Sequence, residues 1–250
     1  MEICVCVKRV PMVGGSIALT PDGMDVDTAM SGFTVSPHEE CAVEEAVRIT
    51  ERLGGSVTVL TLGPAEAADQ LRDMLALGAS RAMLLRTDGA GWGPVATAAA
   101  IAGAVADAGY DLLLFGNEAA DTGGYQVPVR VAHALGLPVL TGIKNLEVSE
   151  SGLRASREYA GAQEVFAVPL PAVVSVREGI NLPRYPSLPG RLRARRAVIE
   201  TADADHPPEA MRTERLTVPA GSGKQAQVLG AGADAVPALV RLLDELGVLS

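Results

Sequence analysis

Residues 111–126 read DLLLFGNEAADTGGYQ, an apolar run followed by a loop rich in glycine and acidic residues. The run at residues 111–115 is typical of a strand buried on both faces, as in a parallel sheet. The loop leads into an apolar segment that ends at Leu135 before Gly136, as a helix does. A strand that passes through a loop into a helix is the repeating unit of α/β folds, so this stretch indicates such a fold.

The loop itself, residues 116–126, has the composition of a ligand site. It joins the carboxyl end of a strand to a helix N-terminus, where open α/β sheets bind ligands. Gly123 and Gly124 permit close approach of a ligand to the backbone, and the unpaired N–H groups of the helix end suit phosphate. Asp121 and Glu118 offer acceptors for ribose or adenine donors. Taken alone, this segment fits nucleotide binding and an ordinary strand-to-helix loop equally well.

The same alternation of strands and helices continues on both sides of this stretch. The expected strands cover residues 3–10, 56–62, 82–85, 138–143 and 165–176. The expected helices cover residues 37–53, 65–77, 95–108 and 127–135. Ser36, Pro37 and Glu39 fit the N-cap, N1 and N3 positions of a capping box. The pattern predicts a three-layer α/β fold with a mostly parallel sheet that ends near residue 176.

The C-terminal part of the chain has a different character. Proline, arginine and glycine become frequent from residue 177, and residues 201–232 are polar and resemble a linker. An amphipathic helix is expected at residues 235–246. We therefore expect a nucleotide-binding α/β domain over residues 1–200 and a C-terminal arm with a helix over residues 201–250.

Composition narrows the class of protein further. Of the 250 residues, 48% are hydrophobic and only 3% aromatic, which suits one core of small branched side chains. The formal net charge of −9 would repel nucleic-acid phosphates, so no nucleic-acid partner is expected. The N-terminus has no signal-peptide features and no apolar stretch has the length of a membrane span, which predicts a cytoplasmic protein. Cys4, Cys6 and Cys41 lack a metal-ligand spacing and are expected to be buried thiols.

No catalytic or metal-binding cluster is expected. Residues 221–225 imitate a P-loop but lack its first glycine and the hydroxyl residue after the lysine. Residues 230–235 imitate a dinucleotide fingerprint, but too little sequence follows for the second strand, so they are interpreted as the lead-in to the last helix. His38, His133 and His206 are scattered along the chain. Only His38, at an expected helix N-terminus, is a secondary candidate for contact with a nucleotide.

Several further segments occur in an order that chance does not assemble. They are residues 7–10 (VKRV), 36–37 (SP), 42–48 (AVEEAVR), 62–64 (LGP), 76–79 (ALGA), 116–126, and 181–190 (NLPRYPSLPG), the last followed by Arg191, Arg193, Arg195 and Arg196. Together these segments resemble the β subunit of electron transfer flavoproteins, from residue 3 to about residue 246. Residues 181–190 carry the most specific part of this resemblance.

The resemblance implies an adenine-nucleotide-hydrolase-like (Rossmann-like) fold and a heterodimer with an α subunit that holds a redox FAD. The β subunit then carries AMP, or a second FAD in electron-bifurcating members, and both stay open here. The implied role is that of an electron carrier rather than an enzyme. It shuttles electrons from flavin dehydrogenases, such as acyl-CoA dehydrogenases, to a quinone oxidoreductase, and its C-terminal arm contacts the α subunit. A stand-alone adenine-nucleotide-binding sensor of the same superfold is the alternative, because a fold does not fix a function.

Carried over residue by residue, the resemblance implies nucleotide contacts from two sets of residues. The strand ends and the first helix contribute Cys6, Ser36, Pro37, His38, Glu39 and Leu62. The loop and the helix after it contribute Glu118, Ala119, Ala120, Asp121, Thr122, Gly123, Gly124, Tyr125, Gln126, Val127, Pro128 and Val129. Val127 and Pro128 depart from the Thr-Gly or Val-Gly pair that is common in the family, and Pro128 lacks an N–H donor.

A partner recognition loop at about residues 180–196 is also implied. In it Leu188 would anchor partner dehydrogenases, with Tyr185 and Pro189 beside it. The prolines of this loop restrict its conformations, which lowers the entropic cost of docking. The alternative is that Leu188 packs back on the core and that the arginines after it form a solvated face.

Overall fold

The computed structural model describes residues 1–12, 17–88, 92–205, 213–218 and 228–249. It divides the chain into two compact units, Met1–Arg215 and Leu216–Ser250. The first unit carries all the described strands, and the second carries the short 3₁₀ helix η2 (Gly232–Ala235) and α6 (Val236–Glu245). The expected C-terminal helix is thus confirmed. The motif at residues 221–225 and His206 lie outside the described residues.

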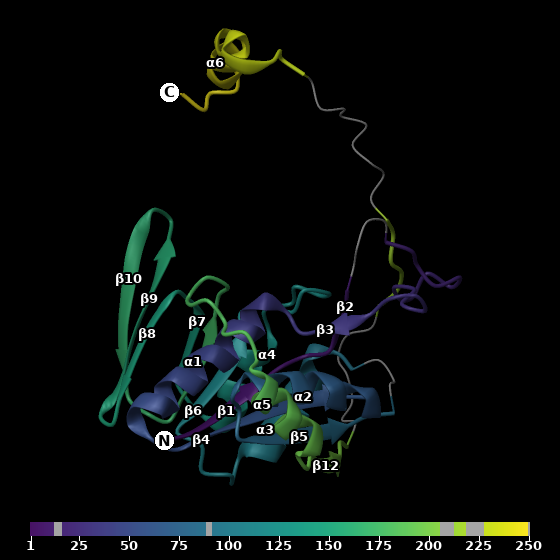
Figure 1. The fold of residues 1–250 in the computed structure, drawn as a ribbon, viewed down its shortest axis with the longest axis vertical. Helices are drawn as coiled ribbons and strands as arrows, with labels where there is room; N and C mark the ends of the chain where they lie inside the picture. Colours follow the sequence, from purple (N-terminus) through teal and green to yellow (C-terminus); the bar gives the residue numbers. More distant parts are fainter. Residues whose placement is uncertain (13–16, 89–91, 206–212, 219–227, 250) are drawn as a thin grey trace. The chain divides into compact units, whose positions relative to one another are not determined.

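A seven-stranded sheet forms the centre of the first unit (Figure 1). Its strands are β1 (Glu2–Cys6), β4 (Ser56–Gly63), β5 (Arg81–Arg86), β6 (Leu112–Gly116), β7 (Val139–Ile143), β11 (Ala172–Val176) and β12 (Glu200–Asp203). They follow the order β12-β5-β4-β1-β6-β11-β7, and every pair of neighbours is parallel. The chain passes from β1 to β4 on one side and later adds β6 on the other. The strand order therefore reverses between β1 and β6, where sheets of this kind bind ligands.

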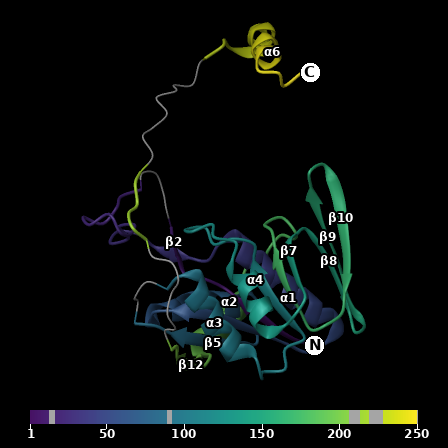
Figure 2. The same ribbon diagram turned by 180° about the vertical axis from the view of Figure 1, so that it is seen from behind.

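Helices cover both faces of this sheet (Figures 1 and 2). One face carries α1 (Pro37–Leu53), α2 (Ala68–Leu77) and α5 (Leu188–Arg196), and the other carries α3 (Pro94–Val105) and α4 (Val127–Leu135). Successive residues of a strand point to opposite faces, so Ile3 and Val5 pack under the first group while Cys4 and Cys6 pack under the second. The three-layer, mostly parallel α/β fold predicted from the sequence is confirmed.

The first helix begins as its sequence predicts. Ser36 is the N-cap of α1, Pro37 follows it, and the Glu39 carboxylate accepts a hydrogen bond of 3.0 Å from the Ser36 N–H. This bond satisfies a donor that the helix itself leaves unpaired. At the other end Gly54, with φ +78°, stops the helix before β4.

A second, antiparallel sheet departs from the expected order of elements. It consists of β8 (Asn145–Ser149), β9 (Gly152–Tyr159) and β10 (Ala162–Val168). The prediction of a single strand over residues 165–176 is therefore wrong, because this run divides between β10 and β11, which belong to different sheets. Pro169 and Pro171 separate the two strands, since proline has no N–H for a strand ladder.

Three other expectations need correction. The first strand ends at Cys6 rather than at residue 10, and β2 (Val10–Pro11) instead pairs antiparallel with β3 (Phe33–Thr34). The sheet does not end near residue 176, because β12 adds to its edge beside β5. All four residues of β12 are exposed, so no apolar pattern predicts the strand. Backbone pairing with β5 and an ion pair of 2.7 Å between Asp203 and Arg86 hold it. The second half of the expected recognition loop forms α5.

The remaining structural expectations concern thiols and membrane spans. Cys4, Cys6 and Cys41 are free and buried, as predicted. Within the ranges that the structure describes, no helix combines the length and the apolar character needed to cross a membrane.

Candidate functional site

The candidate site lies at the carboxyl ends of β1 and β6, where the strand order reverses. Three segments meet there: the residues after β1, the first turn of α1, and the loop at residues 117–126 between β6 and α4. We call this region the crevice. Parallel strands bring their carboxyl ends to one edge of the sheet, so segments far apart in sequence become neighbours.

Glu39 links the end of β1 to α1. Its two carboxylate oxygens accept hydrogen bonds of 3.0 Å from the N–H groups of Lys8 and Ser36. The carboxylate is buried, and burial raises the pKa of Glu39 to about 8, because the two hydrogen bonds and the Lys8 charge offset only part of that effect. Glu39 therefore exchanges a proton in the pH range where proteins work.

Gly116, the last residue of β6, lets this arrangement close. A Cβ atom at Gly116 would lie 2.6 Å from Cγ of Glu39 and 3.0 Å from its backbone nitrogen. The absence of a side chain is thus a steric requirement at this position.

An ion pair ties the loop to the end of β1. The Lys8 Nζ lies 2.7 and 2.8 Å from the two carboxylate oxygens of Asp121. The sequence analysis proposed Asp121 as an acceptor for ribose, but in the structure its carboxylate is paired with Lys8. A ligand that approaches this point meets a neutral pair rather than an isolated carboxylate.

Two further contacts hold the loop on α1. The Ser36 hydroxyl donates to the Glu118 carbonyl oxygen at 3.2 Å, and Nε2 of His38 lies 3.2 Å from the Glu118 carboxylate. Nδ1 of His38 accepts a hydrogen bond of 2.8 Å from the Glu178 N–H. Because Nδ1 accepts, the proton of this imidazole is on Nε2 and points to Glu118.

The middle of the loop is open to solvent. Ala120, Asp121, Thr122, Gly123, Gly124 and Tyr125 are exposed. A Cβ atom added at Gly123 or Gly124 would meet no heavy atom within 4 Å. Gln126 is the N-cap residue of α4, and its side-chain oxygen accepts hydrogen bonds of 2.9 and 3.1 Å from the Arg130 side chain rather than from a helix N–H. Free N–H groups of the first turn of α4 and an unobstructed glycine pair therefore lie side by side.

The structure brings together most of the residues that the sequence singled out. Ser36, Pro37, His38 and Glu39 of α1 adjoin the loop that begins at Glu118. Ala119, Val127, Pro128 and Val129 continue that loop into α4.

Cys6 and Leu62 stand apart from this group, because their side chains pack in the layer of α3 and α4. The Cys6 thiol is buried, and its hydrogen bond with Cys4, followed by burial, raises its pKa well above the usual range. Such a thiol stays protonated and behaves as a small apolar side chain.

Lys8 and Glu178 belong to the site, although sequence reasoning gave them no role in it. Lys8 was visible only as a polar residue near the end of the expected strand at residues 3–10, and such a residue marks a strand end without identifying its partner. Glu178 contributes its backbone N–H, which donates to His38. The pattern of side chains in a sequence does not predict which backbone N–H groups act as donors in a site.

A second candidate site is the exposed segment that leads into α5. Tyr185 is 85% exposed and Leu188 is 72% exposed, so the alternative that Leu188 packs back on the core is wrong. Leu188 is the first residue of α5, and the N-cap Ser187 fixes this start by accepting a hydrogen bond of 3.1 Å from the Gly190 N–H.

The parallel sheet, its reversal of strand order and the glycine-bearing loop at a helix N-terminus define a doubly wound α/β protein of the kind that binds nucleotides. The family described as Electron transfer flavoprotein domain matches residues 24–207. Proteins named electron transfer flavoprotein subunit beta are 34% identical in Bacillus subtilis and 36% identical in Syntrophomonas wolfei, each match covering 82% of this chain and 80% of the relative. The protein of the same name from Bradyrhizobium diazoefficiens is 32% identical over the full length of both chains. The chain therefore belongs to the family of electron transfer flavoprotein β subunits, electron-carrying flavoproteins that pair with an α subunit.

Proposed function

We propose that this chain, paired with its α subunit, shuttles electrons from flavin dehydrogenases such as acyl-CoA dehydrogenases to a quinone-linked oxidoreductase. In this proposal the α subunit holds the redox FAD, which supplies the electron chemistry when bound. The chain described here supplies a nucleotide site, a surface for the partner dehydrogenase and a surface for the α subunit.

The crevice is the observation that carries the nucleotide site. Gly124 and the first turn of α4 would hold the phosphate, because a helix N-terminus presents N–H groups to anions and a Cβ atom at Gly123 or Gly124 would meet no heavy atom within 4 Å. The Gly123 N–H already donates to the Ala119 carbonyl oxygen at 2.9 Å, so Gly123 contributes space rather than a donor. Lys8 would contribute positive charge beside the loop by sharing its ammonium group between Asp121 and the phosphate. Glu118 and Asp121 would accept hydrogen bonds from the ribose or the base. These residues fit AMP, and they fit the adenine part of a second FAD equally well, since both ligands share that part.

The segment at Tyr185, Leu188 and Pro189 supports the partner surface. These residues precede or begin a helix that carries Arg191, Arg193, Arg195 and Arg196. Although the chain has a net charge of −9, these arginines form a local basic surface around the exposed apolar side chains. A partner with an apolar pocket bordered by carboxylates matches it in both respects.

Helix α6 supports a contact with the α subunit. None of its ten residues is buried within its own unit, although Val236, Leu239, Val240 and Leu243 recur at the spacing of one helix face. An apolar face without a cover in its own unit suits burial against another chain. The rival proposal, a stand-alone nucleotide sensor, gives this face no role.

Co-expression with the α subunit tests the proposal. The heterodimer should purify with FAD, and chromatography of the released nucleotides counts its ligands. One FAD and one AMP per heterodimer are expected for the ordinary carrier, and two FAD for the bifurcating form. A stable, colourless monomer that does not bind the α subunit would contradict the proposal.

A further inference from the structure

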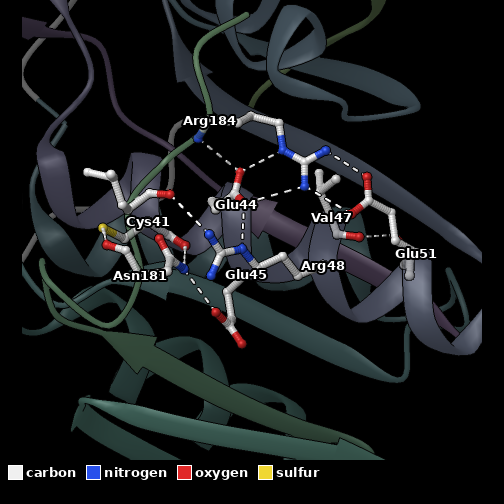
Figure 3. A network of polar contacts seen from close by, with 10 residues as sticks. Cys41, Glu44, Glu45, Val47, Arg48, Glu51, Asn181 and Arg184 are labelled. Carbon is white, nitrogen blue, oxygen red and sulfur yellow. Dashed lines mark hydrogen bonds and ion pairs between the residues drawn. The ribbon is translucent and has the colours of Figure 1, made fainter.

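A network of charged side chains joins α1 to the segment before α5 (Figure 3). Its centre is Glu44, which is only 2% exposed. One Glu44 oxygen accepts hydrogen bonds from the Arg184 Nε at 2.8 Å and from the Arg184 backbone N–H at 3.2 Å. The other oxygen accepts from the Arg48 Nε at 2.5 Å. The far side of the Arg184 guanidinium forms hydrogen bonds of 2.6 and 3.0 Å to the two oxygens of Glu51.

The same helix also holds the residues just before Arg184. The Asn181 side-chain amide donates to the Cys41 carbonyl oxygen at 3.0 Å and to the Glu45 carboxylate at 2.9 Å. The Arg48 Nη2 donates to the Leu182 carbonyl oxygen at 3.1 Å. The side chains of Asn181 and Arg184 and the backbone carbonyl of Leu182 are therefore fixed on α1.

The charges of this network are permanent. Burial by itself would raise the pKa of Glu44, but hydrogen bonds from Arg184 and Arg48 bring it below its usual range. The hydrogen bonds that Arg184 donates to Glu51 and Glu44 raise its pKa above the usual range. Two carboxylates and two guanidinium groups balance, so the buried charge of Glu44 is fully paired. The network is thus a fixed anchor rather than a switch, and we call Glu44 and Arg184 the clamp.

The clamp lies next to the exposed apolar side chains. Leu182 (83% exposed) and Tyr185 (85% exposed) lie close to Arg184 in the sequence, and the exposed Leu188 follows at the start of α5. Beyond Leu188 the chain is fixed again, because α5 packs against α2 so closely that a Cβ at Gly190 would lie 2.8 Å from the Ala76 carbonyl oxygen. The exposed segment is therefore fastened at both ends, with its apolar side chains in solvent between them.

Burying charges for stability alone is inefficient, since an apolar replacement often serves as well. A bidentate arginine does, however, fix geometry. We propose that Glu44 and Arg184 are positioning residues that hold Leu182, Tyr185 and Leu188 in the arrangement that docks the partner dehydrogenase. The clamp removes conformational freedom from this segment before docking, so less is lost when the partner binds. This inference rests on the partner surface proposed above.

The test uses the heterodimer and compares Arg184→Lys with the wild-type protein. Lysine keeps the charge but is unable to span both carboxylates. We expect the KM for the partner dehydrogenase to rise roughly tenfold, about 1.4 kcal/mol, with kcat changed less than about twofold. Amide hydrogen exchange should quicken in the same variant at position 184, where the backbone N–H donates to Glu44, and at Gly190 and Arg191, whose N–H groups donate to Ser187. The matched control is Arg72→Lys, in the exposed pair with Asp69 on α2, which should change neither quantity.

A double-mutant cycle separates positioning from a merely structural role. If the clamp acts by positioning Leu188, Arg184→Lys should add little to the effect of Leu188→Ala. The rise in KM of the double variant should then stay well below the product of the rises in the two single variants. Independent, multiplying effects, or a loss of flavin and thermal stability that accounts for the whole change, would overturn the inference.

The outcomes also distinguish this inference from the proposed docking surface. No effect of Leu188→Ala on KM would contradict the surface itself. If Leu188→Ala raises KM but Arg184→Lys leaves it unchanged, as the control Arg72→Lys does, the positioning role of the clamp is overturned. The proposed docking surface is then still supported. If Arg184→Lys fails to fold, Glu51→Gln carries the test, because it removes only the ion pair that holds the far side of the Arg184 guanidinium and leaves Glu44 and Arg184 themselves unchanged. It should raise KM by roughly twofold to threefold, and an unchanged KM would then overturn the inference.

Discussion

Glu39 is the residue at which the crevice segments converge, and its proton makes a measurable contribution to stability. Its pKa is about 8 in the folded chain, against an ordinary value of 4.5. Between these values the folded state holds the proton and the unfolded state does not. The contribution of Glu39 to stability is therefore complete below about pH 4.5 and is lost as the pH rises to about 8, with a slope of up to about 1.4 kcal/mol per pH unit.

Glu39→Gln should abolish this slope. Thermal unfolding of the heterodimer is followed from about pH 5 to about pH 8, and the difference between variant and wild type is the readout, because other groups titrate equally in both. The glutamine amide faces one backbone N–H with its own N–H, so the variant is destabilised at low pH and the gap narrows as the pH rises. A gap independent of pH would contradict a raised pKa at Glu39.

Gly124 gives a direct test of the nucleotide site at the same scale. A Cβ atom at this position would have no protein atom within 4 Å, so the fold leaves room for a side chain that a bound ligand would meet. We expect Gly124→Val to leave the melting temperature of the nucleotide-free heterodimer within about 2 °C of wild type while the bound nucleotide falls at least tenfold, about 1.4 kcal/mol. Gly103→Val, at an equally open glycine on α3, should retain the nucleotide. Full nucleotide content in Gly124→Val would place the ligand elsewhere.

At the scale of elements, α1 serves both candidate surfaces. Its first turn carries His38 and Glu39 in the crevice, and its next turns carry Glu44 of the clamp and Arg48, which donates a hydrogen bond to Glu44. The Glu178 N–H bonds to His38 only a few residues before Arg184 reaches Glu44. The nucleotide site and the partner surface are thus built on one rigid helix.

The elements also show what a sequence announces and what it conceals. Buried parallel strands such as β1 and β6 were predictable because each is an unbroken apolar run, and α1 because its capping residues are explicit. The sheet of β8, β9 and β10 was not, because its strands alternate apolar and polar residues and one apolar run continues through two prolines into β11. The exposed strand β12 buries nothing and leaves no trace in hydrophobic pattern.

The candidate site divides in the same way. The loop after β6 was predictable from its glycines and its place after a strand. The pairing of Lys8 with Asp121, and of Glu44 with Arg184, was not, because each joins residues more than a hundred positions apart. Only the folded backbone brings such residues together.

For the whole molecule, the chain presents its partners with surfaces of different chemistry. The surface before and on α5 combines apolar side chains with four arginines, although the chain as a whole is acidic. Helix α6 presents an apolar face in a unit of its own, Leu216–Ser250. A basic surface favours fast, reversible docking through electrostatic steering, whereas an apolar face favours a lasting subunit contact.

Leu239→Asp tests that assignment of α6. Leu239 lies with Val236, Val240 and Leu243 on one face of the helix, and burying a leucine contributes roughly 1.5–3 kcal/mol. The aspartate both loses this contribution and brings an unpaired charge into the contact, so the dissociation constant for the α subunit should rise at least tenfold, about 1.4 kcal/mol. Titration calorimetry with the separately purified α subunit measures it. Arg241→Asp puts the same side chain on the opposite face of α6 and should leave the constant within about twofold, well under 1 kcal/mol. Equal weakening by both variants would mean that charge, not the apolar face, governs the contact, and wild-type affinity in Leu239→Asp would exclude α6 from the subunit interface.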